Sequence, residues 1–215
     1  MVNHKTIIEN VEIINIVKKS KFISIVFPCN SVAEFEEQLA SVKHQHKEAN
    51  HYCYAYRIVD SVLLERYQDD KEPGGTAGLP ILSVLKGQDL MDCGIIVARY
   101  FGGTKLGTGG LSRAYSDAAR DALDLAKIVV KETAIHVEIE VDYHHVGKME
   151  YFISTNSIPL LSTMYDNKVK YEIVIKPNDY NDCIDEFNLI TSGQCHIVNE
   201  DNWLGYFNDN KFVKS

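Results

Sequence analysis

Residues 94–116 read GIIVARYFGGTKLGTGGLSRAYS and combine most of the features that decide the fold of this chain. Residues 94–100 are a compact apolar run, which predicts a buried strand. Glycines fill the loop that follows. From about residue 109 to residue 127, apolar residues recur with the 3.6-residue period of a helix. The stretch therefore predicts a strand, a glycine loop and a helix in direct succession.

The same stretch contains no acidic residue, although it contains Arg99, Lys105 and Arg113. Glycine adopts positive φ at little cost, so that neighbouring backbone N–H groups can converge on one point. A helix N-terminus adds unpaired N–H donors and the positive end of the helix dipole. We therefore expect an anion or a nucleic acid to bind here, and the candidate residues are Arg99, Gly102, Gly103, Thr104, Lys105, Gly107, Gly109, Gly110 and Arg113.

A purely structural interpretation of these glycines stays open, because a tight turn and close helix–strand packing also need glycine. The phosphate-binding pattern Gly-x-x-x-x-Gly-Lys-Ser/Thr is absent. A Gly-x-Gly-x-x-Gly pattern starting at Gly107 would end on Ser112 instead of glycine. No particular nucleotide is therefore indicated.

A second glycine cluster, residues 69–80, reads DDKEPGGTAGLP. Glu72, Gly75 and Thr76 are candidates for a supporting loop, in which the Thr76 hydroxyl either donates to an anion or caps the next helix. Asp70 and Glu72 form a carboxylate pair, but no histidine or third carboxylate stands at ligand spacing. We therefore expect no metal and no cofactor.

Arg99 has two possible roles. It either neutralises a bound anion together with Lys105, or it pairs internally with Glu72, because a buried arginine at a strand end needs a carboxylate. The sequence leaves both roles open.

Charge and cysteine content limit the function classes. The 215 residues carry a net charge of −8, which excludes a uniformly basic protein that coats nucleic acid. Residues 1–132 carry −1 and residues 133–215 carry −7, so we expect two domains with these bounds. Five widely spaced cysteines indicate reduced thiols in a cytoplasmic protein, and no apolar run reaches the length of a membrane span. The oligomeric state is not indicated.

Periodicity predicts an α+β fold for the first domain. A hairpin turns at residues 18–21, and a capping box at Ser31 and Glu34 starts a helix that ends near residue 46. Residues 52–59 and 62–67 predict two paired strands. The first of these carries Tyr52, Tyr54 and Tyr56 on one face. We favour a core role for these tyrosines over the stacking of nucleic-acid bases.

The second domain is also α+β. Its alternating strand over residues 135–141 is followed by a helix, a hairpin, a second helix and a strand over residues 194–198. This β-α-β-β-α-β order is that of the ferredoxin-like fold. We expect residues 199–215 to form a polar tail.

Three motifs resemble those of one known family. The segments EPGGTAGLP (72–80), VARYFGGTKLG (97–107) and GLSRAY (110–115) resemble the Impact/YigZ family, and the resemblance covers about residues 18–125. It implies a ribosomal protein S5 domain 2-like first domain, related to domain IV of elongation factor G. It also implies a ferredoxin-like second domain, similar to domain V of that factor. Lys71 departs from the family pattern, in which many members have a small residue.

The resemblance also implies a link to translation. Eukaryotic members restrain the kinase that phosphorylates initiation factor 2, using an additional N-terminal RWD domain. The stretch before Lys18 is too short for that domain, so we do not expect the kinase-regulating role in this chain.

Our leading hypothesis is a non-enzymatic, translation-associated protein that binds RNA, the ribosome or a translation factor through a glycine-rich basic surface. A hydrolase is not indicated, because no Gly-x-Ser-x-Gly or His-Glu-x-x-His motif occurs. The alternative hypothesis is a protein or enzyme that binds a nucleotide or phosphorylated metabolite at residues 102–110. A third possibility is a protein–protein adaptor whose glycine motifs are structural.

Overall fold

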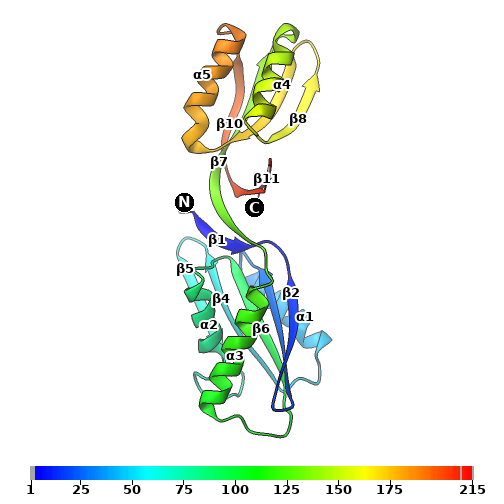
Figure 1. Cartoon of the computed structure of the whole chain (residues 1–215), viewed down its shortest axis with the longest axis vertical. Coiled ribbons are helices and arrows are strands. Elements are labelled where there is room, and N and C mark those ends of the chain that lie inside the picture. The colour runs from blue at the N-terminus through cyan, green and yellow to red at the C-terminus, as the bar shows by residue number, and fades with distance from the viewer. Residues whose placement is uncertain (1–2, 209, 215) are drawn as a thin grey trace. The chain divides into compact units, whose positions relative to one another are not determined.

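The computed structural model describes residues 3–208 and 210–214. The chain folds into two compact units, His4–Val129 and Val130–Ser215 (Figure 1). Both units are mixtures of helices and antiparallel strands, as the α+β prediction requires. The junction of the units falls within a long strand, slightly before the boundary that we expected after Glu132.

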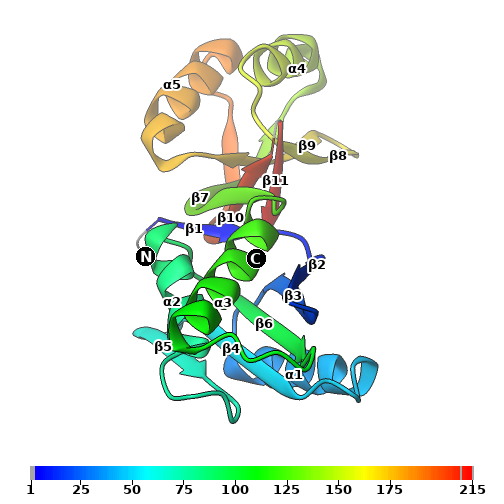
Figure 2. The same cartoon turned by 60° about the horizontal axis from the view of Figure 1, so that its bottom comes forward.

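The first unit contains, in chain order, β1 (His4–Ile7), β2 (Val11–Val17), β3 (Ser20–Pro28), α1 (Val32–Gln45), β4 (His51–Val59), β5 (Leu63–Gln68), α2 (Gly78–Gly87), β6 (Cys93–Tyr100) and α3 (Thr108–Leu123). Its sheet has the strand order β2-β3-β6-β4-β5 with every pair antiparallel. Helices α2 and α3 cover one face of this sheet and α1 covers the other (Figure 2). The centrally placed β6 is therefore buried on both faces, which explains its continuous apolar run.

The predicted hairpin between β2 and β3 is confirmed, with a tighter turn than expected. Val17 pairs with Ser20, so only Lys18 and Lys19 form the turn. Both have positive φ, 45° and 67°, as the two central residues of a type I′ turn require.

The predicted helix over residues 31–46 is also confirmed. The Ser31 hydroxyl accepts a hydrogen bond from the Glu34 N–H at 3.2 Å, and the Glu34 carboxylate accepts one from the Asn30 N–H. The tyrosine face of β4 packs against this helix, with the Phe35 ring centroid 4.9 Å from that of Tyr54 and 4.6 Å from that of Tyr56. The tyrosines therefore belong to the core, as we favoured.

Helix α3 is shorter than its periodicity predicted. It ends at Leu123, and Leu125, which lies within the predicted span of 109–127, is 65% exposed. Arg120 pairs with Asp117 at 3.0 Å on the exposed side of the helix.

The second unit contains β7 (Ile128–Val141), α4 (Val146–Thr155), β8 (Leu160–Tyr165), β9 (Val169–Ile175), α5 (Tyr180–Thr191), β10 (His196–Asn208) and β11 (Lys211–Lys214), with short 3₁₀ turns at Tyr143–His145 and Pro177–Asp179. The strands lie in the order β11-β10-β7-β9-β8. Residues of α4 and α5, among them Met149 and Phe187, share one core with Val137, Tyr171 and Ile173 of the sheet.

The prediction of a polar tail after residue 198 is wrong. Strand β10 continues to Asn208 and pairs with β11. Aromatic residues of this segment stabilise the longer strand. The Trp203 ring stacks on the His136 ring with 3.8 Å between the ring centroids, and Phe212 packs on Ala134 and Val174. The sequence did not predict this strand, because the segment has too few apolar residues to show the apolar–polar alternation of a half-buried strand.

Candidate functional site

The glycine-rich loop connects β6 to α3 at one end of the first unit (Figure 1). The N-cap of α3 is Gly107, with φ of 74°, and no side chain caps the first turn. That turn also lacks an acidic residue, so its unpaired N–H groups and the helix dipole favour an anion. Lys105, Gly103 and Thr104 are exposed in this loop.

A close backbone approach brings a second basic segment to the loop. A Cβ atom on Gly102 would lie 2.1 Å from the carbonyl carbon of Lys19 and 2.3 Å from the Ser20 nitrogen. The Gly102 N–H also donates to the Ser20 hydroxyl at 3.1 Å. The β2–β3 turn with Lys18 and Lys19 therefore lies directly against the glycine loop. Sequence reasoning treated these lysines only as a turn and missed this contact.

We define the basic surface as Lys18, Lys19, Lys105 and Arg113, all of them exposed. Lys18 and Arg113 line the same small hollow of about 250 Å³, together with Leu106 and Gly110. Phe101 precedes the loop and is 46% exposed. An exposed aromatic ring thus belongs to the same loop as Lys105.

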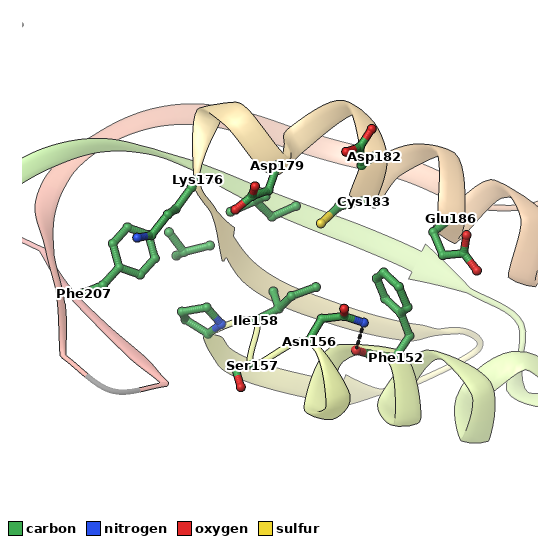
Figure 3. A pocket seen from close by; sticks show the side chains of 13 residues that line it. Phe152, Asn156, Ser157, Ile158, Lys176, Asp179, Asp182, Cys183, Glu186 and Phe207 are labelled. Atoms are coloured by element: carbon green, nitrogen blue, oxygen red, sulfur yellow. Dashed lines mark hydrogen bonds between the residues drawn. The ribbon is translucent and has the colours of Figure 1, made fainter.

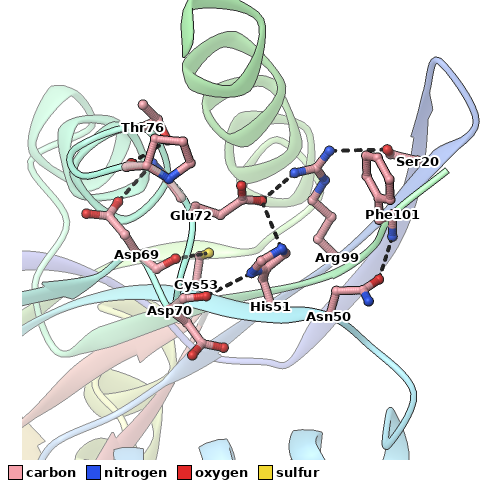
Figure 4. A network of polar contacts seen from close by, with 12 residues as sticks. Ser20, Asn50, His51, Cys53, Asp69, Asp70, Glu72, Thr76, Arg99 and Phe101 are labelled. Carbon is pink, nitrogen blue, oxygen red and sulfur yellow. Dashed lines mark hydrogen bonds and ion pairs between the residues drawn. The ribbon is translucent and has the colours of Figure 1, made fainter. Parts of the chain in front are cut away.

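Arg99 is not part of the basic surface. Its Nη1 atom lies 2.5 Å from Oε1 of Glu72, its Nη2 donates to the Ser20 hydroxyl at 3.3 Å, and both charged side chains are only 4% exposed (Figure 4). The structure therefore has the internal pairing that the sequence left open. Within the described residues, the Arg99 Nε is buried without a hydrogen-bond partner. Glu72 is the centre of this network, since the Tyr115 hydroxyl also donates to it at 2.7 Å.

His51 and Cys53 of β4 extend the network (Figure 4). His51 Nδ1 lies 2.8 Å from the carbonyl oxygen of Asp70, and since a carbonyl only accepts, Nδ1 carries the proton. His51 Nε2 lies 3.9 Å from Glu72 Oε1. The Cys53 thiol donates to the Asp69 carbonyl at 3.0 Å and approaches the Tyr115 hydroxyl at 3.3 Å.

The thiols of this chain are poor nucleophiles. Burial raises the pKa of Cys53, and it raises the pKa of Tyr115 as well, with further contributions from Cys53 and Glu72. Burial also raises the pKa of Cys29 and of Cys195 to about 11, that of Cys93 to about 12, and that of Cys183 in the same direction. The thiolate is the reactive form, so thiols that stay protonated near neutral pH have a structural role.

The supporting loop is held by Asp69 rather than by Thr76. The Asp69 carboxylate accepts hydrogen bonds from the N–H groups of Gly75 at 2.8 Å, Ala77 at 3.0 Å and Gly78 at 2.8 Å. The Asp69 side chain, which lies outside α2, thereby accepts hydrogen bonds from backbone N–H groups at the N-terminus of the helix that have no partner within it. The Thr76 hydroxyl donates to the Pro73 carbonyl at 2.6 Å, and Thr76 does not cap α2.

Asp70 does not join Glu72 in a cation site. Its carboxylate accepts a hydrogen bond from the Tyr52 N–H at 2.7 Å, whereas the Glu72 carboxylate faces Arg99. Within residues 3–208 and 210–214, no group of three or more His, Cys, Asp and Glu side chains has the arrangement of a metal site.

The 69–80 glycine cluster and the start of α2 border α3 at a shallow hollow of about 560 Å³. Gly75 and Leu79 line it on one side, and Ser112, Arg113 and Ser116 line it on the other. Arg113 is thus shared between this hollow and the smaller one beside Lys18. Gly109 has open space around its Cβ position, so nothing in its surroundings requires a glycine there.

The chain thus consists of two units of helices and antiparallel strands. The first unit has a glycine-rich loop next to the buried Arg99–Glu72 pair. The Impact N-terminal domain family matches residues 18–123. The chain belongs to the IMPACT family. None of the helices in the described part of the chain has the length and apolar character of a membrane span.

Several relatives are similar over most of their length. IMPACT family member YvyE of Bacillus subtilis is 33% identical over 182 residues, which cover 85% of this chain and 84% of that protein. IMPACT family member YigZ of Escherichia coli is 29% identical over 167 residues, 77% of this chain and 82% of that protein. A crystal structure of a hypothetical protein matches with a TM-score of 0.60 at 25% identity, covering 92% of this chain and 97% of that chain.

Proposed function

We propose that this chain is a non-enzymatic, translation-associated protein that binds single-stranded RNA, on the ribosome or free, through the basic surface and Phe101. The observation that carries the proposal is the contact of the Lys18–Lys19 turn with the glycine loop at Gly102. It brings cations from a distant segment to the loop that begins at the exposed Phe101. Proteins that bind single strands combine these two elements, a basic groove for phosphates and aromatic rings for bases.

The remaining features of the loop support an anionic partner. The first turn of α3 offers unpaired N–H groups without an acidic neighbour, and residues 94–116 contain no carboxylate. Arg99 does not bind the anion itself. It orders the loop through its hydrogen bonds to Glu72 and Ser20. We further propose that the first unit has the ribosomal protein S5 domain 2-like fold and the second the ferredoxin-like fold, whose β-α-β-β-α-β order and strand order β10-β7-β9-β8 it follows.

The proposal is tested by fluorescence anisotropy with a labelled single-stranded RNA at several salt concentrations. We expect Lys18→Ala/Lys19→Ala/Lys105→Ala to weaken binding and to lower the slope of log K against log salt by about 2, since each phosphate contact contributes about 0.7. Phe101→Ala should weaken binding by about 1–3 kcal/mol and leave that slope unchanged, because stacking does not release counterions.

Lys5→Ala provides the matched control. Lys5 is exposed on β1, at the opposite end of the same unit from the β2–β3 turn (Figure 1). The control should keep the affinity of the unmodified chain. Failure of the unmodified chain to bind RNA or to co-sediment with ribosomes at low salt would overturn the proposal. Equal weakening by Lys5→Ala and by the triple variant would overturn the assigned surface.

A second candidate function is the binding of a nucleotide or phosphorylated metabolite. It is favoured by the hollow that Gly75 of the 69–80 cluster lines together with Ser112 and Arg113 of α3. A ligand that binds only the native state raises its stability, so a thermal-shift screen of nucleotides and sugar phosphates tests it. The shift should disappear in Arg113→Gln. No shift with any ligand would exclude this candidate and leave the RNA proposal untouched.

A further inference from the structure

A hollow of about 510 Å³ lies within the second unit, between the end of α4, the start of α5 and strand β9 (Figure 3). Small-molecule sites in proteins have volumes of this order. Its lining is part apolar and part polar: Ile158, Val174 and Ile175 are buried and Phe152 and Phe207 are half-buried on the apolar part, and Asn156 and Ser157 add polar groups. The apolar part can pack against a hydrocarbon chain.

Three carboxylates line this hollow: Asp179 in the 3₁₀ turn directly before α5, Asp182 in the first turn of α5, and Glu186 one turn further along (Figure 3). Their spacing of four residues puts Asp182 and Glu186 on one face of the helix. Among the described residues, none of the three takes part in an ion pair or a side-chain hydrogen bond. Their negative charge is therefore uncompensated within the second unit.

Lys176 is the only cation that lines the hollow among the described residues, and it already has an acidic and an aromatic partner. Its Nζ lies 3.7 Å from the Glu132 carboxylate and 4.8 Å from the centre of the Phe207 ring. An incoming ligand therefore meets an apolar floor and a negatively charged side. This combination is complementary to an aliphatic cation.

The spacing of the carboxylates indicates more than one positive group. A helix rises 1.5 Å per residue, so Asp182 and Glu186 are separated along the axis by about 6 Å, and Asp179 lies in the 3₁₀ turn just before the helix. A chain of three or four methylene groups between two ammonium groups spans a step of this size. A single metal ion would instead need ligands that converge on one point, and no such group exists in residues 3–208 and 210–214.

We propose that this hollow binds a linear aliphatic polyamine, with its ammonium groups against Asp179, Asp182 and Glu186 and its methylene chain on the apolar floor. The site is separate from the basic surface and does not depend on the function proposed for it. All the residues that form it belong to the second unit.

Isothermal titration calorimetry of the full chain with spermidine tests this proposal. We expect Asp182→Asn/Glu186→Gln to weaken spermidine binding by about tenfold or more, because two exposed ion pairs are removed. The matched control is Asp166→Asn/Asp185→Asn, which makes the same change of charge at exposed positions outside the hollow. It should change the dissociation constant by less than about twofold, because screening weakens distant surface charges.

Two further titrations separate this site from general attraction of cations. Butylamine, which has one ammonium group, should bind at least about tenfold more weakly than spermidine, and Mg²⁺ at equal charge should not displace spermidine. The absence of spermidine binding, equal weakening in the two double variants, or displacement by Mg²⁺ would each overturn the proposal. Circular dichroism melting of both variants without ligand establishes that a lost signal is not lost folding.

Discussion

The guanidinium of Arg99 and the carboxylate of Glu72 form an ion pair, with 2.5 Å between Nη1 and Oε1 and with 4% exposure of each side chain. The two residues are 27 positions apart, on β6 and on the loop before α2. The pair therefore joins the two glycine clusters of the sequence inside the fold. It also removes Arg99 from the cations that are available to a ligand.

Loss of Glu72 should be strongly destabilising. Glu72→Ala leaves a buried guanidinium uncompensated, and removing one partner of a buried pair costs about 3–5 kcal/mol. Urea denaturation measures the change in the free energy of unfolding. In an Arg99→Leu background the same substitution should cost much less, because the unpaired charge is gone. Equal costs in both backgrounds would show that the pair is not coupled.

Gly102→Ala should disrupt the contact between the glycine loop and the β2–β3 turn. The new methyl group would lie 2.1 Å from a backbone carbon of Lys19. Because this atom belongs to the backbone, a change of side-chain rotamer cannot remove the clash. We expect a loss of about 1–3 kcal/mol, typical of overpacking, in thermal or urea unfolding. Gly109→Ala is the control: its Cβ position is open, so it should be neutral or stabilise α3 by about 0.5–1 kcal/mol. A neutral Gly102→Ala would contradict the close approach.

Asp69→Ala should destabilise the first unit by about 2 kcal/mol or more. The Asp69 carboxylate accepts from the N–H groups of Gly75, Ala77 and Gly78, and hydrogen bonds to charged groups contribute about 1.5–3 kcal/mol each. Thr76→Val removes a single hydrogen bond, to Pro73, and should cost about 1 kcal/mol. Hydrogen exchange of the first-turn amides of α2 should quicken in Asp69→Ala only. The reverse order of the two effects would restore Thr76 as the cap.

Glu65 should make the free energy of unfolding of the first unit depend on pH in the acidic range. The hydrogen bond from Lys86 lowers the pKa of Glu65 from its ordinary value of 4.5, and Arg57 adds to this effect. A carboxyl with a lowered folded-state pKa stabilises the fold above pH 4.5, and this contribution is lost as the pH falls through the folded value. Glu65→Gln should therefore cost up to about 1 kcal/mol at pH 7 and progressively less below pH 4.5. A cost that is independent of pH would contradict the assignment.

Local sequence patterns determined most of the elements. The Ser31–Glu34 cap, the β2–β3 hairpin and the alternation in β7 depend on interactions between neighbours in the chain, so their residues alone indicate them. The family was also indicated by contiguous glycine motifs, and the match to residues 18–123 confirmed it. The patterns failed where tertiary contacts overrode them, as in β10, whose extension depends on Trp203 stacking on His136 of β7.

The candidate site could be predicted only in part. Sequence alone located the glycine loop with Lys105 and Arg113, because glycine content and the absence of acid are visible in a contiguous stretch. Only the tertiary structure paired Arg99 with Glu72 and brought Lys18 and Lys19 to Gly102. These contacts join residues far apart in the chain, and their geometry depends on the register of β3 with β6, in which Lys21 pairs with Tyr100. No local pattern encodes that register, so the choice between a bound anion and an internal ion pair required the folded chain.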